Sequence, residues 1–197
     1  MITFSLLLES LKKPKAIAAF KLATKHITAV DSRDNAWMFS LKDLMDSHDW
    51  HPLGTGKYGA VFGKSGYPYI IKVFMKDTAY LKWLDYAKKN QDNPYVPKIK
   101  GKVVRLGTHF MAVRLEKLVA GGSPIDLYRD ATNGNKDAKA IVNFLKANTN
   151  LLDLHDGNVM KRGKQLVITD PVYNYFNASE KKFTIDPEDV SEFTSIL

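Results

Sequence analysis

The sequence contains no cysteine, which excludes disulfide bonds, thiol catalysis and cysteine-ligated zinc or iron–sulfur centres. Long apolar runs are also missing, since no stretch approaches the ~20 residues that cross a bilayer. The apolar residues 2–8 do not have the pattern of a signal sequence, because cations follow them instead of preceding them and Glu9 interrupts the run. We therefore expect a cytoplasmic protein with no membrane partner.

The overall composition is that of a globular protein. The chain has 197 residues, of which 45% are hydrophobic and 25% charged, so collagen, coiled-coil and disordered classes are excluded. The net charge of +8 favours phosphate-bearing ligands or acidic protein surfaces. Apart from a lysine-rich start the charge is scattered, and no zinc-finger spacing or RNA-binding aromatic stripe is present. This pattern argues against nucleic acid as the main partner.

Hydrophobic periodicity and turn residues predict a sheet-rich half followed by a helical half, an α+β pattern. Residues 1–48 are expected to be helical, and we favour an amphipathic helix packed on the main domain over a partner-binding arm. The expected strands are 60–62, 69–74, 102–106, 110–115 and one on each side of Gly163. The expected helices are 78–89 and a stretch that follows residues 121–124 and runs through Ala138 to Asn148.

A glycine-rich motif, G-x-G-x-x-G-x-V, is formed by Gly54, Gly56, Gly59 and Val61. Glycines at these positions let a strand–turn–strand backbone approach a phosphate closely. The predicted strands on both sides argue against a Rossmann turn, in which a helix follows the glycines directly. The alternative is a tight hairpin whose glycines serve only the turn.

A lysine, Lys72, lies on the strand that follows this motif. A cation within an apolar strand must reach solvent or meet an anion. A phosphate held under the glycine hairpin would provide that anion. The alternative is an edge-strand lysine that faces water.

Two further segments carry carboxylates and an amide. Asp153 is followed five residues later by Asn158, and Asp170 ends a short apolar strand. Such groups can supply a proton acceptor and oxygen ligands for Mg²⁺, which prefers one or two carboxylates together with phosphate and water. Each could instead be a turn or cap residue, since Asp-Gly and Asp-Pro are common turn pairs.

Taken together, the glycine loop, strand lysine, Asp-x-x-x-x-Asn loop and strand-end aspartate follow the order found in protein kinases. The chain resembles the protein-kinase-like superfamily over residues 50–175. Within it, the chain is most similar to the early serine/threonine kinases of T-odd (T-seven-type) bacteriophages, through residues 153–160, 168–172 and 183–188.

The resemblance implies a bilobal kinase fold with a small antiparallel β-sheet N-lobe and a truncated helical C-lobe. Residues 1–48 would form an N-terminal helical extension, and residues 49–118 the N-lobe, with a hinge at 116–118. Residues 119–197 would form the reduced C-lobe, with a catalytic loop at 151–160 and a metal-binding segment at 168–172.

The resemblance also implies the role of each site residue. Gly54, Gly56, Gly59 and Val61 would cover ATP, and Lys72 would hold its α- and β-phosphates. Glu116 and Leu118 would meet adenine through the hinge backbone. Asp153 would accept the proton of the substrate hydroxyl, and Asn158 and Asp170 would hold Mg²⁺. His155 stands where serine/threonine kinases carry a lysine that contacts phosphate.

The sequence departs from the kinase pattern at several points. Leu151 and Leu152 replace the usual His-Arg pair, and Asp170 is followed by Pro-Val instead of Phe-Gly. No Ala-Pro-Glu signature follows. No glutamate occurs between Lys72 and Glu116, so the expected ion pair of the strand lysine would need another carboxylate. The candidates are Glu9, Asp77, Asp85 and Glu116.

The order of these motifs favours a compact ATP- and Mg²⁺-dependent kinase. The resemblance implies a protein kinase that phosphorylates Ser or Thr of host bacterial proteins and is encoded by a phage as a host takeover factor. One alternative is a small-molecule kinase of the aminoglycoside or choline type, which also favours Asp-Leu-His-x-x-Asn. Another is a pseudokinase or nucleotide-binding module that acts on a host protein by contact.

Overall fold

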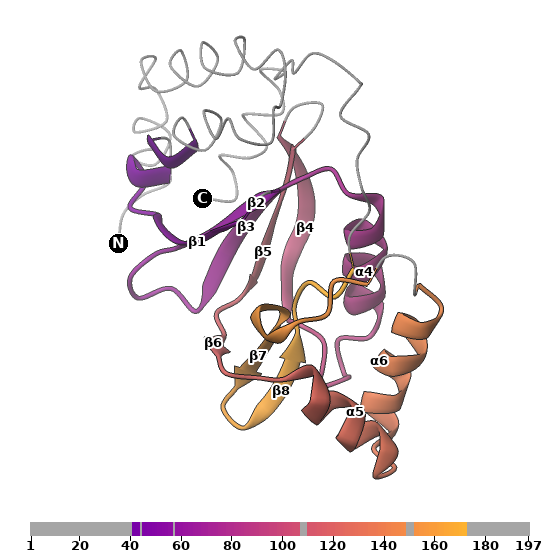
Figure 1. The fold of residues 1–197 in the computed structure, drawn as a ribbon. Helices are drawn as coiled ribbons and strands as arrows, with labels where there is room; N and C mark the ends of the chain where they lie inside the picture. The colour runs from indigo at the N-terminus through magenta and orange to yellow at the C-terminus, as the bar shows by residue number, and fades with distance from the viewer. Residues whose placement is uncertain (1–40, 44, 57, 107–109, 149–151, 173–197) are drawn as a thin grey trace. The chain divides into compact units, whose positions relative to one another are not determined.

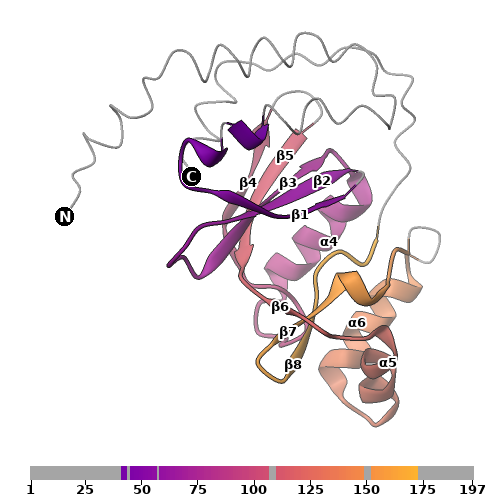
Figure 2. The ribbon, with the colours of Figure 1, turned by 60° about the vertical axis from the view of Figure 1, so that its left-hand side comes forward.

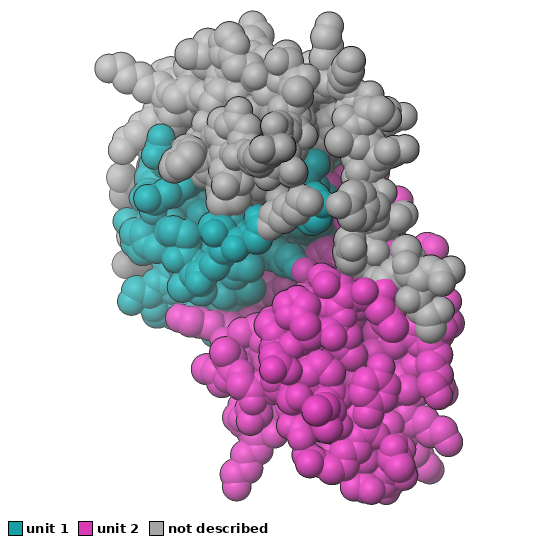
Figure 3. Space-filling model, viewed as in Figure 1, with its two compact units in different colours: residues 1–75, 102–114, 177–197 teal, residues 76–101, 115–176 magenta. Residues whose placement is uncertain are grey.

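The computed structural model describes residues 41–43, 45–56, 58–106, 110–148 and 152–172. These residues belong to two compact units, one containing 41–75 and 102–114 and the other 76–101 and 115–172, with the gaps just given (Figure 3). Of the predicted helical extension, residues 41–43 and 45–46 are helical, and residues 1–40 lie outside the described part. The segment 183–188, used for the kinase resemblance, also lies outside it.

A five-stranded antiparallel sheet is the main feature of the first unit (Figure 1). Its spatial order is β1-β2-β3-β5-β4. The strands are β1 (His51–Gly56), β2 (Gly59–Gly63), β3 (Tyr69–Met75), β4 (Ile99–Leu106) and β5 (Phe110–Glu116). The predicted strands at 60–62, 69–74, 102–106 and 110–115 are thus confirmed, each with slightly wider bounds.

Along β2 and β3, buried side chains alternate with more exposed ones, and the buried set forms the core on one face of the sheet. Ala60 and Phe62 of β2 and Ile71 and Val73 of β3 are almost fully buried. Because side chains two apart on a strand share a face, these residues form one apolar surface and leave Val61 and Lys72 on the opposite face.

In the second unit, the first helix is α4 (Thr78–Lys89), in agreement with the helix predicted at 78–89. Its start is fixed by Asp77, whose carboxylate accepts hydrogen bonds from the backbone N–H groups of Ala79 (2.7 Å) and Tyr80 (3.1 Å). Its buried stripe follows helical spacing and consists of Ala79, Tyr80, Trp83, Leu84 and Ala87.

Two more helices follow, α5 (Pro124–Thr132) and α6 (Lys136–Lys146), which lie side by side in both ribbon views (Figures 1 and 2). They divide the region expected to be helical as far as Asn148. Gly134 has a φ of +90°, a left-handed conformation that ends α5. The side chain of Asn135 then caps α6 by accepting from Asp137 N and Ala138 N, both at 3.0 Å.

A small sheet with the order β6-β7-β8 completes the described part of the second unit. It is made of β6 (Val119–Ala120), β7 (Val159–Arg162) and β8 (Gln165–Ile168). The two strands predicted around Gly163 are therefore confirmed. Gly163 has a φ of +62° in the tight turn that joins them, a conformation that glycine adopts without strain.

The structure is therefore of the mixed α+β type expected from the sequence. Among the residues that the structure describes, no helix is both long and apolar enough to cross a membrane.

Candidate active site

Three of the predicted ligand-binding residues form one row across the sheet of the first unit. Gly54 of β1 pairs with Val61 of β2, and Val61 pairs with Lys72 of β3. Directly paired residues of neighbouring strands point to the same face, so the glycine, the valine and the half-buried lysine line one surface. The backbone pairing Gly56–Gly59 closes the hairpin at its tip.

The three motif glycines differ in what surrounds them. A side chain at Gly59 would bring its Cβ to 2.8 Å from the carbonyl oxygen of Val73, so packing against β3 requires glycine there. Nothing lies within 4 Å of a Cβ built at Gly54, and one built at Gly56 would meet only a backbone oxygen at 3.9 Å. Neither of these two has a positive φ. Open space over Gly54 and Gly56 is what close approach of a ligand would need.

In the second unit, the loop after α6 holds Asp153 and Asn158 together. The side-chain N–H₂ of Asn158 donates to the backbone carbonyl of Asp153 at 2.7 Å, and its Nδ2 lies 3.4 Å from Asp153 Oδ2. Because this bond fixes which end of the amide faces the loop, the Oδ1 atom of Asn158 points the other way. An amide oxygen oriented in this manner can serve as a metal ligand.

The Asp170 segment is joined to this loop by backbone bonds. Asp153 N donates to Pro171 O at 2.8 Å, and Leu152 and Val172 form an antiparallel bridge. Thr169 donates twice to the carbonyl of Asn158, from its backbone N at 2.9 Å and from its hydroxyl at 3.1 Å. The structure therefore brings together Asp153, Asn158 and the segment that carries Asp170.

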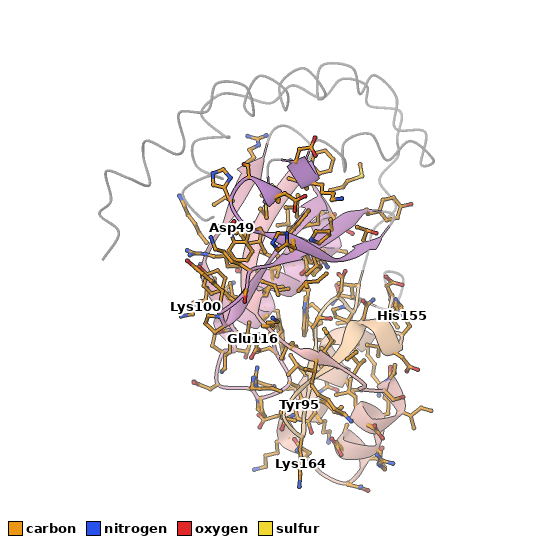
Figure 4. All side chains as sticks on the ribbon, turned by 90° about the vertical axis from the view of Figure 1, so that its left-hand side faces the viewer. Asp49, Tyr95, Lys100, Glu116, His155 and Lys164 are labelled. Carbon is orange, nitrogen blue, oxygen red and sulfur yellow. The ribbon has the colours of Figure 1, made fainter. Side chains whose placement is uncertain are left out.

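The predicted site histidine, His155, lies across the short 3₁₀ helix Asp156–Asn158. Its Nδ1 accepts from the backbone N–H of Gly157 at 3.1 Å. Its Nε2 lies 3.1 Å from Asn158 Nδ2 and 3.9 Å from Asp153 Oδ1. A Cβ on Gly157 would approach the ring to 2.8 Å, so glycine is what admits the imidazole here. The exposed ring, marked in Figure 4, lies beside both predicted site residues.

Helix α4 also reaches the Asp170 segment. The indole N–H of Trp83 donates to the carbonyl of Thr169 at 3.2 Å. The pKa of the Tyr80 phenol is raised well above its ordinary value, first by burial and then by the negative charges of Asp170 and Asp77. Two buried aromatic residues of one helix therefore adjoin the segment that carries Asp170.

The predicted hinge begins at Glu116, whose side chain has a structural partner that the sequence analysis missed. Arg162 of β7 donates from Nε to Glu116 Oε2 at 2.6 Å, and its Nη2 donates to the other carboxylate oxygen. Arg162 also donates to the carbonyls of Pro94 and Val96, each at 3.1 Å. The pKa of the Arg162 guanidinium is raised, chiefly by its hydrogen bond to Glu116. Tyr95, between these carbonyls in the chain, and Glu116 are labelled in Figure 4.

Of the carboxylates considered as partners for Lys72, the three that the structure describes each have another contact. Asp77 caps α4, Asp85 forms an ion pair with Lys89 at 2.7 Å, and Glu116 binds Arg162. The fourth candidate, Glu9, lies outside the described residues.

The donor set at Asn158 and Asp170 fits Mg²⁺, because both side chains present oxygen atoms, the ligands that hard cations prefer. Across the described ranges, no group of three or more His, Asp or Glu side chains is arranged to hold a metal ion. Two protein oxygens suit a Mg²⁺ ion that takes its remaining ligands from phosphate and water.

Each unit carries residues of the kind that phosphoryl transfer uses. The first has a glycine hairpin beside a strand lysine, and the second has an aspartate–asparagine loop bonded to the segment of a second aspartate. The family model described as bacteriophage T7 protein kinase matches residues 63–195, and the chain belongs to this family. Membership implies serine/threonine protein kinase activity, with ATP and protein substrates. The matched range contains Lys72, Asp153, Asn158 and Asp170, and the glycine hairpin precedes it. A comparison with curated proteins found no match.

Proposed function

We propose that the chain transfers the γ-phosphate of ATP, with Mg²⁺, to Ser or Thr hydroxyls of host bacterial proteins in the host cytoplasm. The observation that supports this most directly is the bonded arrangement of Asp153, Asn158 and the Asp170 segment. The Asp153 carboxylate is partly exposed, Asn158 of the same loop presents an amide oxygen, and Asp170 of the neighbouring segment carries a second carboxylate.

Each residue has a defined role in this proposal. Asp153, whose side chain is 41% exposed, accepts the proton of the substrate hydroxyl. The hydroxyl oxygen then bonds to the γ-phosphorus as the bond to the β,γ-bridging oxygen breaks and ADP leaves. Asn158 and Asp170 hold Mg²⁺, which neutralises charge on the phosphates. His155, whose Nε2 lies 3.1 Å from Asn158 Nδ2 and 3.9 Å from Asp153 Oδ1, contacts the γ-phosphate.

The nucleotide is held by the first unit and the hinge in the same proposal. Gly54, Gly56, Gly59 and Val61 cover ATP, and Lys72 binds the α- and β-phosphates. The backbone at Glu116 and Leu118 binds adenine. Residues 49–118 then correspond to the N-lobe and 119–197 to the reduced C-lobe of a bilobal kinase, with 1–48 as an extension.

Phosphate transfer from γ-labelled ATP into a bacterial lysate tests this proposal. The wild type is compared with Asp153→Asn and with Asp156→Asn, a matched control that changes an exposed carboxylate in the same loop. We expect Asp153→Asn to lose roughly 10²–10⁴-fold of the activity and the control to retain it. Wild-type labelling by Asp153→Asn would contradict the assigned role. Labelling of aminoglycosides or choline, but of no lysate protein, would contradict the protein substrate.

A further inference from the structure

Thr169 has an unusual concentration of hydrogen bonds for a residue with no assigned role. Its backbone N and its hydroxyl both donate to the carbonyl of Asn158, at 2.9 and 3.1 Å. Its own carbonyl accepts from the indole N–H of Trp83 at 3.2 Å. Thr169 directly precedes Asp170, so these bonds link the backbones of both candidate metal ligands to α4.

Trp83 is itself held rigidly. The side chain is fully buried, and its ring lies 5.7 Å from that of Tyr86 and 5.4 Å from that of Phe144, measured between centroids. A close-packed aromatic group of this kind keeps its rotamer, and its N–H therefore points in a fixed direction. The position of the Thr169 carbonyl is consequently set by the core of the second unit.

We propose that Thr169 and Trp83 are positioning residues that fix Asp170 relative to Asn158 for metal binding. The inference rests on the proposed function, in which these two side chains hold Mg²⁺. Mg²⁺ demands near-octahedral geometry, so a small displacement of one ligand weakens binding. Groups that orient metal ligands by hydrogen bonds typically alter metal affinity when removed.

The proposal also gives α4 a role that its sequence does not suggest. The helix after the strand lysine carries no glutamate, but it supplies Trp83 to the segment next to Asp170. The helix thereby positions the segment that carries Asp170. Removing the Trp83 hydrogen bond should therefore lower the affinity for the metal ion first.

The test measures Mn²⁺ binding to the full chain in the presence of a non-hydrolysable ATP analogue. The electron paramagnetic resonance signal of free Mn²⁺ reports how much of the ion remains unbound. Thr169→Val keeps the shape of the side chain but removes the hydroxyl donor, and Thr169→Ser retains it. Trp83→Phe removes the indole N–H. We expect Thr169→Val and Trp83→Phe to weaken Mn²⁺ binding about tenfold, and Thr169→Ser to bind like the wild type.

Phe144→Leu is the matched control, because it alters the same aromatic group and keeps Trp83 and Asn158, the hydrogen-bond partners of Thr169. Equal weakening by Phe144→Leu and Thr169→Val would overturn the inference, since general loosening of the core would then explain both. Wild-type affinity in Thr169→Val would also overturn it, and this variant serves if Trp83→Phe does not fold.

Asp170→Asn separates this inference from the proposed function. If Asp170→Asn binds Mn²⁺ normally, the metal site itself is wrong, and the positioning role falls with it. If Asp170→Asn loses binding while Thr169→Val and Trp83→Phe keep it, only the positioning role is wrong. Loss in all three, with Thr169→Ser and Phe144→Leu unaffected, is the expected result.

Discussion

The side-chain amide of Asn158 donates to the backbone carbonyl of Asp153 at 2.7 Å. This bond sets the direction of two groups at once, because it anchors the loop at Asp153 and turns Asn158 Oδ1 away from it. A ligand amide that also serves as a structural donor cannot be replaced by a carboxylate, which only accepts.

Asn158→Asp tests this double role. The variant keeps oxygen ligands for a cation but loses the donor, and it places a second carboxylate close to Asp153. We expect phosphotransfer to fall roughly 10–100-fold, measured as kcat with saturating Mg²⁺ and ATP.

Asn148→Asp is the control for this variant, because Asn148 also donates from its side chain to a backbone carbonyl, that of Phe144 at 2.8 Å. It lies outside the candidate site, and we expect its activity to match the wild type. Full activity in Asn158→Asp would show that the donor is dispensable.

The motif glycines make a second prediction, which separates packing from ligand binding. Gly59→Ala forces a Cβ against the Val73 carbonyl and should cost about 1–3 kcal/mol of unfolding free energy in a urea titration. Gly54→Ala meets no atom within 4 Å and should leave the unfolding free energy within about 0.5 kcal/mol.

Gly54→Ala should instead raise the KM for ATP about tenfold, equivalent to about 1.4 kcal/mol of lost binding, because the methyl group occupies the space where a phosphate approaches. Unchanged ATP kinetics in a stably folded Gly54→Ala would argue that this glycine serves the hairpin alone.

The ion pair between Arg162 and Glu116 gives a third prediction. Arg162→Met removes the bonds to the Glu116 carboxylate and to two backbone carbonyls. It leaves the largely buried carboxylate without its cation, although Lys98 N still donates to Glu116 Oε1 at 2.7 Å. We expect a loss of about 2–3 kcal/mol of unfolding free energy. In a double-mutant cycle with Glu116→Gln, a coupling of about 1–2 kcal/mol should appear.

The exposed pair Arg129–Asp126 on α5 is the reference for that cycle. It is separated by three residues on a helix surface, where such pairs contribute less than about 1 kcal/mol. Similar coupling energies for the two pairs would mean that the enclosed position of Arg162 adds nothing.

Tyr95 gives a prediction about alkaline pH. Burial, followed by its hydrogen bond to Asp130 (2.8 Å), raises the pKa of the Tyr95 phenol to about 12. The usual value is about 10, so the folded state favours the neutral phenol. Its stabilising contribution is complete below about pH 10 and is lost as the pH rises through about 12.

Urea unfolding of wild type and Tyr95→Phe between pH 7 and 12 measures this contribution as a difference. We expect a constant difference up to about pH 10 and a decline of about 2 kcal/mol by pH 12. Asp130→Asn removes the negative charge beside the phenol and so lowers its pKa. In that background the difference in unfolding free energy should stop declining at a lower pH. A difference that does not change with pH would contradict the raised pKa.

Local features of the fold followed from the sequence because they depend on neighbours in the chain. Helix α4 begins and ends as predicted, since Asp77 caps its start and Asn90 its end. The β7–β8 hairpin was predictable from Gly163, because glycine adopts without strain the positive φ of +62° that this turn requires. The break between α5 and α6 was missed, although Gly134 and Asn135 carried the signal for it.

The contacts that organise the candidate site were not predictable in the same way. Trp83 and Thr169 are 86 residues apart, and Arg162 and Glu116 are 46 apart. The sequence spacing of Trp83 and Thr169 does not identify them as partners. Arg162 is likewise one of many cations, and its position in the sequence does not point to Glu116. Such pairs are chosen by which buried donors and acceptors meet when the elements pack.

The sequence by itself determined the kinase resemblance and the α+β class. It also predicted Lys72, Asp153, Asn158 and Asp170 as site residues, because phosphoryl transfer needs a cation, a proton acceptor and oxygen ligands for Mg²⁺. The tertiary structure decided how they are held. In the folded protein Glu116 forms an ion pair with Arg162, Gly59 packs against β3, and the Asp170 segment is hydrogen-bonded to α4. Packing determines these contacts, because a buried polar group can bond only to the partners that packing brings within reach.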